Sequence, residues 1–330
     1  MDESNSGASG DGVAVVIPTY NGMSRGYLCS AIASVLGQSV RPAEIVIVDD
    51  GSTDGTAEAI MRRIDCPQMK VIRISGNVGP AEARNEGVRA TTAPLIAFLD
   101  DDDEWMPDKL VAHLEFLARR RYNLVFSTVQ RIDAQGRNIA GDRPIPAESL
   151  SWPGILFCDP VVTPSAVVIR REAFLTVGGF CKELRLPEDW DLCARIARMG
   201  TIGCISRPLV RYRVHSRQMA SGRTSGWVRK QTLSALEHLT CQLSQEQRDF
   251  VINAYAYGGA WRSLAALNLR TAWDLATSSG AVDLPLLLRR LLLGVCSKMV
   301  PQTSSYLNRY ELKRSIRRFL DLEQIAADHS

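Results

Sequence analysis

The strongest constraint on the fold is a set of three short apolar runs that end in polar residues and alternate with helical patterns. The runs cover residues 13–18, 44–49 and 95–99 and are rich in Val, Ile and Leu. Continuous apolar runs of this length are typical of parallel strands covered on both faces. Residues 56–64 carry an i, i+3, i+4, i+7 apolar stripe, and 80–90 begins with proline, so both are predicted as helices. The pattern predicts an α/β, Rossmann-like fold with a mostly parallel sheet flanked by helices.

The rest of the chain divides at a change in composition near residue 225. Before that point further strands and helices are predicted at residues 70–74, 107–117, 124–130, 166–170, 187–199 and 202–205. Beyond it, Leu and Ala recur at helical spacing. We therefore predict a flexible tail over residues 1–12, an α/β domain over residues 13–225 and a helical C-terminal region over residues 226–330.

Composition and charge exclude several classes of protein. The formal net charge is only +3 in 330 residues, which is too small for a nucleic-acid-binding face. Eight cysteines are present without a C-x-x-C pair, which argues against a disulfide framework or a zinc knuckle. Residues 1–12 lack the basic and apolar regions of a signal peptide. We therefore expect a cytoplasmic protein that does not bind nucleic acid.

One leucine-rich stretch, residues 282–295, is open to several interpretations. It contains Pro285 and the pair Arg289 and Arg290, and it is shorter than the about 20 apolar residues that span a bilayer. An amphipathic helix of this kind is suited to lying on an anionic membrane surface, here at the inner face of the membrane. Packing in the core and a homodimer interface are equally consistent with the pattern.

Polar residues follow each of the first three apolar runs. The first run ends in P-T-Y-N (18–21), the second in D-D-G-S (49–52), and the third is followed by D-D-D-D-E (100–104). In doubly wound sheets the ligand binds outside the carboxyl ends of the strands. We therefore expect these three segments to converge on one crevice. Asp-Gly-Ser is also a common turn sequence, so Asp50 is ranked below Asp49 as a ligand contact.

The acidic run after the third strand suggests a metal site. Asp100 and Asp102 lie two residues apart at a strand end, so both carboxylates are expected to project to the same side. Such a pair, together with substrate phosphates, is a usual way to hold Mg²⁺ or Mn²⁺. The alternative is a solvated loop that caps a helix starting near Pro107. No G-x-G-x-x-G or G-x-x-x-x-G-K-[ST] motif follows the first strand, so dinucleotide and P-loop sites lack their usual support.

Four segments, in order and spacing, resemble the large family 2 of glycosyltransferases. They are V-V-I-P-T-Y-N (15–21), Q-S-V-R-P-A-E-I-V-I-V-D-D-G-S-T-D-G (38–55), the run that ends in L-I-A-F-L-D-D-D (77–102), and G-G-F-C-K-E-L-R-L-P-E-D-W-D-L-C-A-R (178–195). The resemblance extends over about residues 13–217. It implies the GT-A fold and an inverting enzyme that transfers a sugar, without a covalent intermediate, from a nucleotide-sugar that we expect to be a UDP-sugar.

The resemblance implies a nucleotide-sugar site formed by the strand-end loops. Asp49 is expected to reach the base and Tyr20 to flank the ring. Asn77 and Gly79 are expected to shape the loop ahead of Arg84, whose guanidinium would face the nucleotide. The residues implied for nucleotide-sugar binding are Pro18, Thr19, Tyr20, Asn21, Asp49, Asn77, Gly79, Arg84, Asp100 and Asp101.

The acidic run matches the D-x-D motif of the family. By resemblance, Asp100 contacts the ribose or the donor sugar, Asp101 fills the variable middle position, and Asp102 ligates Mn²⁺ or Mg²⁺. The segment Y-R-V-H (212–215) resembles the family's Y-R-x-H, which implies His215 as a second metal ligand. Its alternative is a structural histidine, since imidazole is softer than Mg²⁺ prefers.

The last part of the acidic run is interpreted differently. Asp103 and Glu104 are predicted to cap the helix that begins near Pro107, because acids favour helix N-termini. Trp105 is predicted to be a packing residue. On this interpretation only the first three acids take part in the chemistry.

The segment P-E-D-W-D-L (187–192) resembles the family's E-D segment, in which the aspartate is the general base. Asp189 would remove the proton of the acceptor hydroxyl on the face opposite the leaving diphosphate. Glu188 and Trp190 are placed on the acceptor side. The structural alternative is that Pro-Glu-Asp starts a helix in which Asp191 pairs with Arg195 at i+4.

The expected acceptor is a saccharide or a lipid-linked molecule, in glycan, polysaccharide or cell-envelope biosynthesis. One alternative is a sugar-nucleotide nucleotidyltransferase, although no glycine-rich, lysine-bearing loop follows the first strand. A second alternative is a non-enzymatic partner whose function is carried by the C-terminal helices.

Overall fold

The computed structural model describes residues 12–63, 66–141, 150, 152, 155, 161–184, 186–219, 225–241, 245 and 248. The chain forms two compact units, Met1–Gln242 and Leu243–Ser330. All the helices and strands below belong to the first unit. Residues 1–11 of the predicted tail, and the leucine-rich stretch 282–295, lie outside the described residues.

A nine-stranded sheet forms the centre of the described part of the first unit. Its order is β3-β2-β1-β4-β8-β6-β9-β5, and β7 pairs with β6. The pairings make β1–β4, β6 and β9 run in one direction and β5, β7 and β8 in the other. The strands are β1 Val13–Thr19, β2 Glu44–Asp49, β3 Met69–Arg73, β4 Leu95–Phe98, β5 Glu104–Trp105, β6 Leu124–Ile132, β7 Asn138–Gly141, β8 Val167–Arg170 and β9 Ile202–Arg213. The predicted α/β fold with a mostly parallel sheet is confirmed.

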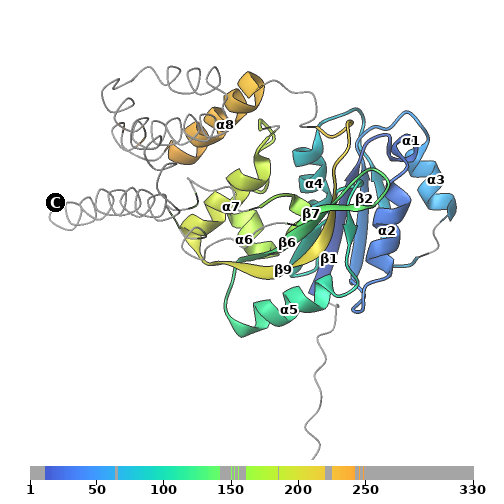
Figure 1. Ribbon diagram of the computed structural model, residues 1–330, viewed down its shortest axis with the longest axis horizontal. Coiled ribbons are helices and arrows are strands. Elements are labelled where there is room, and N and C mark those ends of the chain that lie inside the picture. Colours follow the sequence, from blue (N-terminus) through green and yellow to red (C-terminus); the bar gives the residue numbers. More distant parts are fainter. Residues whose placement is uncertain are drawn as a thin grey trace, which may run out of the picture. The chain divides into compact units, whose positions relative to one another are not determined.

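Helices flank this sheet (Figure 1). Helix α4 packs against β1 and β2, α5 against β6 and β9, and α7 against β9 and α8. The helices are α1 Gly22–Arg25, α2 Leu28–Leu36, α3 Thr56–Arg63, α4 Pro80–Arg89, α5 Lys109–Arg119, α6 Arg171–Thr176, α7 Glu188–Met199 and α8 Ser225–Thr240. A short 3-10 helix, Pro164–Ala166, precedes β8.

Strand β1 explains why the first apolar run is continuous. All seven of its residues are buried, and it is hydrogen-bonded in parallel to β2 on one side and to β4 on the other. The register places Thr19 beside Asp49 and Val16 beside Phe98. The ends of β1, β2 and β4, which carry the three polar segments, therefore lie at one edge of the sheet.

Two predicted elements differ from the structure. The predicted strand at 202–205 continues as β9 to Arg213, because its backbone also pairs with β6 and β5 beyond residue 205. The prediction ended too early because residues 206–208, which are exposed, interrupt the apolar pattern. Helix α5 begins at Lys109, and Asp108 holds the N-cap position. Glu104 lies in β5, and Asp103 precedes it, so the prediction that these two acids cap a helix is wrong.

Helix α8 begins at the predicted boundary near residue 225 but belongs to the first compact unit. Its His238 Nδ1 lies 2.7 Å from Asp191 Oδ1 on α7. Asp191 also accepts a hydrogen bond from Nε of Arg195 at 2.9 Å, as the i+4 spacing predicted. In the part of the chain that the structure describes, every helix is too short or too polar to cross a bilayer.

Gly87 sets how closely α4 approaches the sheet. A Cβ atom at this position would lie 2.3 Å from Cγ1 of Val16 and 3.1 Å from Cγ2 of Val48. Overpacking of this kind costs about 1–3 kcal/mol, so we expect Gly87→Ala to lower the free energy of unfolding by that amount in urea titrations. Gly12→Ala is the control, since its Cβ would meet Cγ of Pro94 at an ordinary 3.5 Å. Equal stability of the two variants would contradict the packing.

Lys109 is fully buried at the start of α5. Its Nζ lies 4.1 Å from the centroid of the Trp105 ring and has no hydrogen-bond partner among the described residues. Burial lowers the pKa of Lys109 well below its ordinary value. The aromatic face offsets only part of that cost, about 2 kcal/mol when such a pair is desolvated.

We expect Lys109→Met to raise the free energy of unfolding at pH 7. Burial disfavours the charged form of the Lys109 amine in the folded protein, whereas the unfolded chain keeps that charge in water. The folded pKa is the lower one, so wild-type stability rises with pH between the folded pKa and the unfolded value of 10.5. The advantage of the variant should therefore shrink between neutral pH and about pH 10 in urea unfolding. The exposed Lys230→Met is the control. An advantage that does not change with pH would refute the shift.

Candidate active site

The polar segments at the ends of β1 and β2 are joined by hydrogen bonds. The backbone N–H of Asn21 donates to Oγ of Ser52 at 2.8 Å, and Oδ1 of Asn21 accepts from the N–H of Thr53 at 2.9 Å. Asn21 has a φ of 53°, a left-handed conformation that asparagine tolerates better than most residues. Pro18 is buried within β1, and Tyr20 is partly exposed beside this loop.

The two acids at the end of β2 have different surroundings. Asp49 is fully buried, and its Oδ1 accepts from the N–H of Ser52 at 2.9 Å. Its Oδ2 has no hydrogen-bond partner among the described residues, and Nε of Arg73 lies 3.9 Å away. A buried carboxylate oxygen without a partner is costly and calls for a ligand donor.

Asp50 instead holds the loop that precedes α4. Its two oxygens accept from the N–H groups of Val78 at 2.8 Å and Gly79 at 2.9 Å. Burial raises the pKa of Asp50, and these two bonds oppose the shift. Gly79 adopts a φ of 96°, so the predicted loop-shaping role agrees with its conformation, while Asn77 is exposed in the same loop. Asp50 is therefore the loop-fixing acid, and Asp49 keeps an oxygen without a hydrogen bond among the described residues.

Asp101, the middle residue of the acidic D-x-D segment, is buried. Its Oδ2 accepts from Oγ1 of Thr19 at 2.6 Å, and its Oδ1 lies 3.4 Å from Nη1 of Arg25. Burial, with the neighbouring carboxylate of Asp102, raises the pKa of Asp101 to about 6. Thr19 and Asp101 therefore bind each other, which ties the end of β1 to the acidic run.

Arg84 lies between two carboxylates. Its Nη2 is 2.5 Å from Oδ1 of Asp100, and its Nη1 is 3.0 Å from Oε1 of Glu188 at the start of α7. Burial opposes the charge of Arg84, but the two carboxylates outweigh it and raise its pKa. Burial raises the pKa of Glu188, and Arg84 opposes that shift. The buried pair of Arg84 and Glu188, together with the partly exposed Asp100, joins the acidic run to α7. Glu188 is therefore a partner of Arg84 in the structure, although we predicted it to contact the acceptor.

Asp102 and His215 come together at the same edge. Oδ2 of Asp102 lies 3.0 Å from Nε2 of His215, which follows β9. The ring of Tyr27 lies 5.2 Å from that of His215, centroid to centroid. Among the described residues no three His, Cys, Asp or Glu side chains form a group that could hold a metal. Two protein donors with substrate phosphates nevertheless match the way Mg²⁺ is commonly held.

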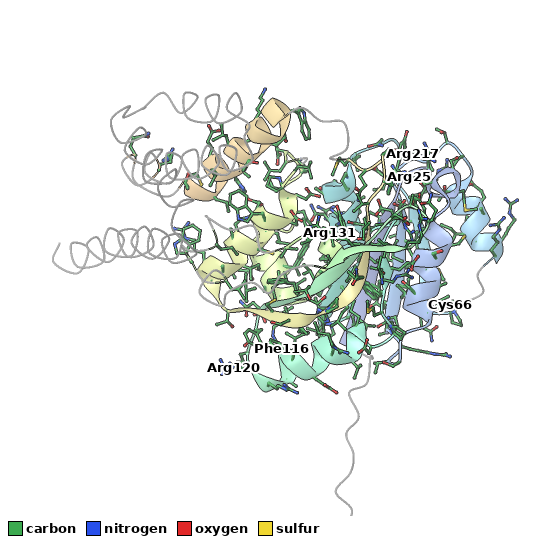
Figure 2. All side chains as sticks on the ribbon, in the orientation of Figure 1. Arg25, Cys66, Phe116, Arg120, Arg131 and Arg217 are labelled. Carbon is green, nitrogen blue, oxygen red and sulfur yellow. The ribbon has the colours of Figure 1, made fainter. Side chains whose placement is uncertain are left out.

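Arginine side chains surround this edge. Arg25 and Arg217 are labelled together in Figure 2, and Nη1 of Arg217 donates to the carbonyl of Ser24 at 3.4 Å. Arg213 places its guanidinium 4.6 Å from the centroid of the Tyr27 ring and donates from Nε to the carbonyl of Asp102 at 2.9 Å. The edge therefore carries several fixed cations near the acidic run, an arrangement suited to a phosphate ligand.

Asp103 is buried at the centre of the acidic run. Its Oδ2 accepts from Oγ of Ser165 at 2.7 Å and lies 3.1 Å from Oγ1 of Thr163, and its Oδ1 accepts from the N–H of Arg213 at 2.9 Å. These roles of Asp103, Thr163 and Ser165 were not predicted. They could not be inferred from the sequence, because the partners are far apart along the chain.

Asp189 and Trp190 begin α7 beside Glu188. Asp189 is partly exposed, and its Oδ1 accepts from the N–H of Trp190 at 2.9 Å. Trp190 is only 2% exposed, and its Nε1 donates to the carbonyl of Ile155 at 2.8 Å. The indole therefore belongs to the core, and the placement of Trp190 on the acceptor side stays a prediction.

Comparison with known proteins identifies the family of this chain. The family model "Glycosyl transferase family 2" matches residues 14–178, which is 165 of 330 residues. A glycosyltransferase of Rickettsia felis is 32% identical over 204 residues, 61% of this chain and 33% of that protein. TuaG of Bacillus subtilis, a glycosyltransferase named for teichuronic acid biosynthesis, is 36% identical over 48% of this chain and 62% of its own length. The chain spans about a third of the length of the Rickettsia relatives it matches.

Solved structures share the fold. The crystal structure of S. aureus TarS 1-349 in complex with UDP-GlcNAc aligns with a TM-score of 0.59 at 16% identity. The alignment covers 81% of this chain and 80% of that one. Identity this low supports the fold alone, and the match to the family model shows the family. The chain is a member of glycosyl transferase family 2 and has the GT-A fold.

Proposed function

We propose that this protein transfers a sugar from a UDP-sugar to an acceptor hydroxyl by direct displacement, with inversion at the anomeric carbon. Two features at one sheet edge carry the proposal. One is a buried oxygen of Asp49 that has no hydrogen-bond partner among the described residues, and the other is the contact between Asp102 and His215. The Asp49 oxygen suits a nucleotide base that donates an N–H, and the Asp102 and His215 pair suits a metal-bound diphosphate. The TarS structure with UDP-GlcNAc supports the same class of donor.

The residues present fit a divalent metal, Mn²⁺ or Mg²⁺. Asp102 and His215 would hold it, and Asp102 supplies the hard oxygen donor that both ions accept. When bound, such an ion neutralises charge on the diphosphate and helps it to leave. Around it, Arg84 keeps Asp100 oriented at 2.5 Å, so Asp100 is placed to accept from a ribose or sugar hydroxyl.

Asp189 is the proposed general base. It lies in the first turn of α7 and is partly exposed, so a substrate hydroxyl has access to it. Its neighbour Glu188 is ion-paired with Arg84, which in turn contacts Asp100. This chain of contacts connects the helix that carries the base to the loop that would hold the donor. In direct displacement the base removes the acceptor proton on the face opposite the leaving group.

The acceptor is proposed to be a saccharide or a lipid-linked molecule. Relatives are named for teichuronic acid biosynthesis in Bacillus subtilis and for amylovoran biosynthesis in Erwinia amylovora. These names support a role in polysaccharide or cell-envelope synthesis. We also propose a cytoplasmic location. Residues 282–295, proposed for peripheral membrane contact or for dimerisation, lie outside the described residues.

A variant of Asp189 tests the base. We expect Asp189→Asn to lower kcat by about 10²- to 10⁴-fold, the usual contribution of a positioned general base. The dissociation constant for UDP should not change, because Asp189 is not among the proposed nucleotide contacts. Transfer from UDP-sugars is measured together with UDP binding by calorimetry. Asp108→Asn, the same change at a helix start paired with Arg207, is the control. Wild-type turnover in Asp189→Asn would refute the assignment.

A variant of Asp49 tests the nucleotide. An amide NH₂ in place of the free Oδ2 would face the N–H of uracil without an acceptor, at a cost of about 1.5–3 kcal/mol. We therefore expect Asp49→Asn to weaken UDP binding by roughly 10- to 150-fold. CDP, which presents an acceptor at the same ring position, should lose less affinity or gain some. Calorimetry with both nucleotides separates this result from misfolding, which would weaken both alike. Unchanged preference for UDP would contradict the proposal.

The nucleotidyltransferase alternative is tested separately. Incubation of the wild-type protein with UTP and a sugar 1-phosphate releases pyrophosphate only if the protein makes nucleotide-sugars. We expect no pyrophosphate and expect UDP release from a UDP-sugar in the presence of acceptor. Pyrophosphate release would replace the proposed reaction with the alternative one.

A further inference from the structure

Asp103 joins three segments that are distant in the sequence. Its carboxylate is bound by the hydroxyl of Ser165, lies within hydrogen-bond distance of the hydroxyl of Thr163, and accepts from the backbone N–H of Arg213. These partners precede β8 or lie at the end of β9. Asp103 itself is 1% exposed. A carboxylate has two oxygens with about four acceptor sites, so one side chain can hold all three segments.

Each partner of Asp103 in turn holds a residue of the proposed donor site. Oγ of Ser165 accepts from the backbone N–H of Asp100 at 2.9 Å. Arg213 donates from its Nε to the carbonyl of Asp102 at 2.9 Å, and His215 follows it by two residues. The contacts of Asp103 therefore run to both sides of the Asp102 and His215 pair. The backbone of Asp100 is held through Ser165, and the end of β9, which His215 follows, is held through Arg213.

We propose that Asp103 is a positioning residue that sets the separation of Asp102 and His215 and thereby the affinity of the site for a divalent metal. The inference rests on the proposed function, since it assigns a role within that same site. Asp103 is not itself a proposed metal ligand, because all its contacts are to the protein's own hydroxyl and N–H groups. Its action is through the backbone of β9 and of the acidic run.

The carboxylate is specifically required by this arrangement. Oγ of Ser165 already accepts from Asp100, so its single proton is directed to Asp103. An amide at position 103 keeps one oxygen, which satisfies the N–H of Arg213. The NH₂ group would then point at two hydroxyls, and Ser165 would lose its acceptor. The hydroxyl of Ser165 must then turn its proton away from residue 103, which weakens the connection that runs through Ser165 to Asp100.

The test measures metal binding apart from catalysis. Mn²⁺ binding to the full chain with saturating UDP is measured by electron paramagnetic resonance, and UDP binding without metal by calorimetry in EDTA. We expect Asp103→Asn to weaken Mn²⁺ binding by about tenfold or more, as is usual for residues that orient metal ligands. UDP affinity in EDTA should not change. The nitrogen modulation of the Mn²⁺ signal from a bound imidazole should also weaken.

Two further variants keep the result interpretable. Ser165→Ala breaks the connection from Asp103 to Asp100 and should weaken Mn²⁺ binding in the same direction. The double variant should lose less than the two single losses combined, because both residues lie on one path. Asp108→Asn, which makes the same chemical change at a half-exposed site, should bind Mn²⁺ as the wild type does.

The outcomes are distinct. Wild-type Mn²⁺ affinity in folded Asp103→Asn would overturn the inference. If Asp103→Asn does not fold, wild-type Mn²⁺ affinity in Ser165→Ala would overturn it. Parallel loss of UDP binding in EDTA and of Mn²⁺ binding would show a general structural role and would also overturn it. A wild-type protein that binds neither UDP nor Mn²⁺ would instead remove the proposed function, and the inference with it.

Discussion

The parallel pairing of β1 with β2 and β4 is the constraint on which the rest of the structure depends. Its backbone hydrogen bonds are fully buried, and buried N–H and C=O groups must be paired. The register that satisfies them places Thr19 beside Asp49 and ends β4 just before the acidic run. A slip of one residue would turn apolar side chains to the wrong face. The polar segments are therefore held at one edge by the packing of the sheet.

Each of the first three carboxylates of the acidic run has a nearby side chain that can donate a hydrogen bond. Asp100 pairs with Arg84, Asp101 lies near Arg25, and Asp102 contacts His215. Removing carboxylates from water is costly unless they are paired or hydrogen-bonded. The fourth, Asp103, is held by hydroxyl and N–H groups. Mutual repulsion of the acids is thus reduced before any ligand binds, and their positions are fixed.

The same contacts join the proposed donor side of the site to the proposed acceptor side. Arg84 on α4 reaches both Asp100 and Glu188, and Glu188 starts the helix that carries Asp189. That helix is held further by the contact of Asp191 with His238 of α8 and by the hydrogen bond from Arg195 to the carbonyl of Val177. The proposed base is therefore mounted on an element whose position is determined by buried ion pairs. Rigid support of this kind is what a preorganised catalytic site requires.

Sequence reasoning succeeded where the signal is local. The apolar runs predicted β1, β2 and β4, and the order of polar residues after them predicted the shared edge. Asp49 was ranked above Asp50, and the structure gives Asp49 the unpartnered oxygen and Asp50 the loop contacts. The helix-cap interpretation of Asp103 and Glu104 was wrong, because an acid just ahead of a helix can also be buried and hydrogen-bonded elsewhere. Arg213, whose N–H donates to Asp103, is 110 residues away in the sequence.

The sequence by itself determined the fold class, the family and the edge of the sheet that carries the candidate site, because strand periodicity and motif order are properties of neighbouring residues. Only the tertiary structure decided which acids remain available. It buried Trp190 in the core, bound Asp101 to Thr19, and paired Glu188 with Arg84. The physical reason is that the availability of a polar side chain depends on partners supplied by distant segments, which meet only when the sheet and its helices are assembled.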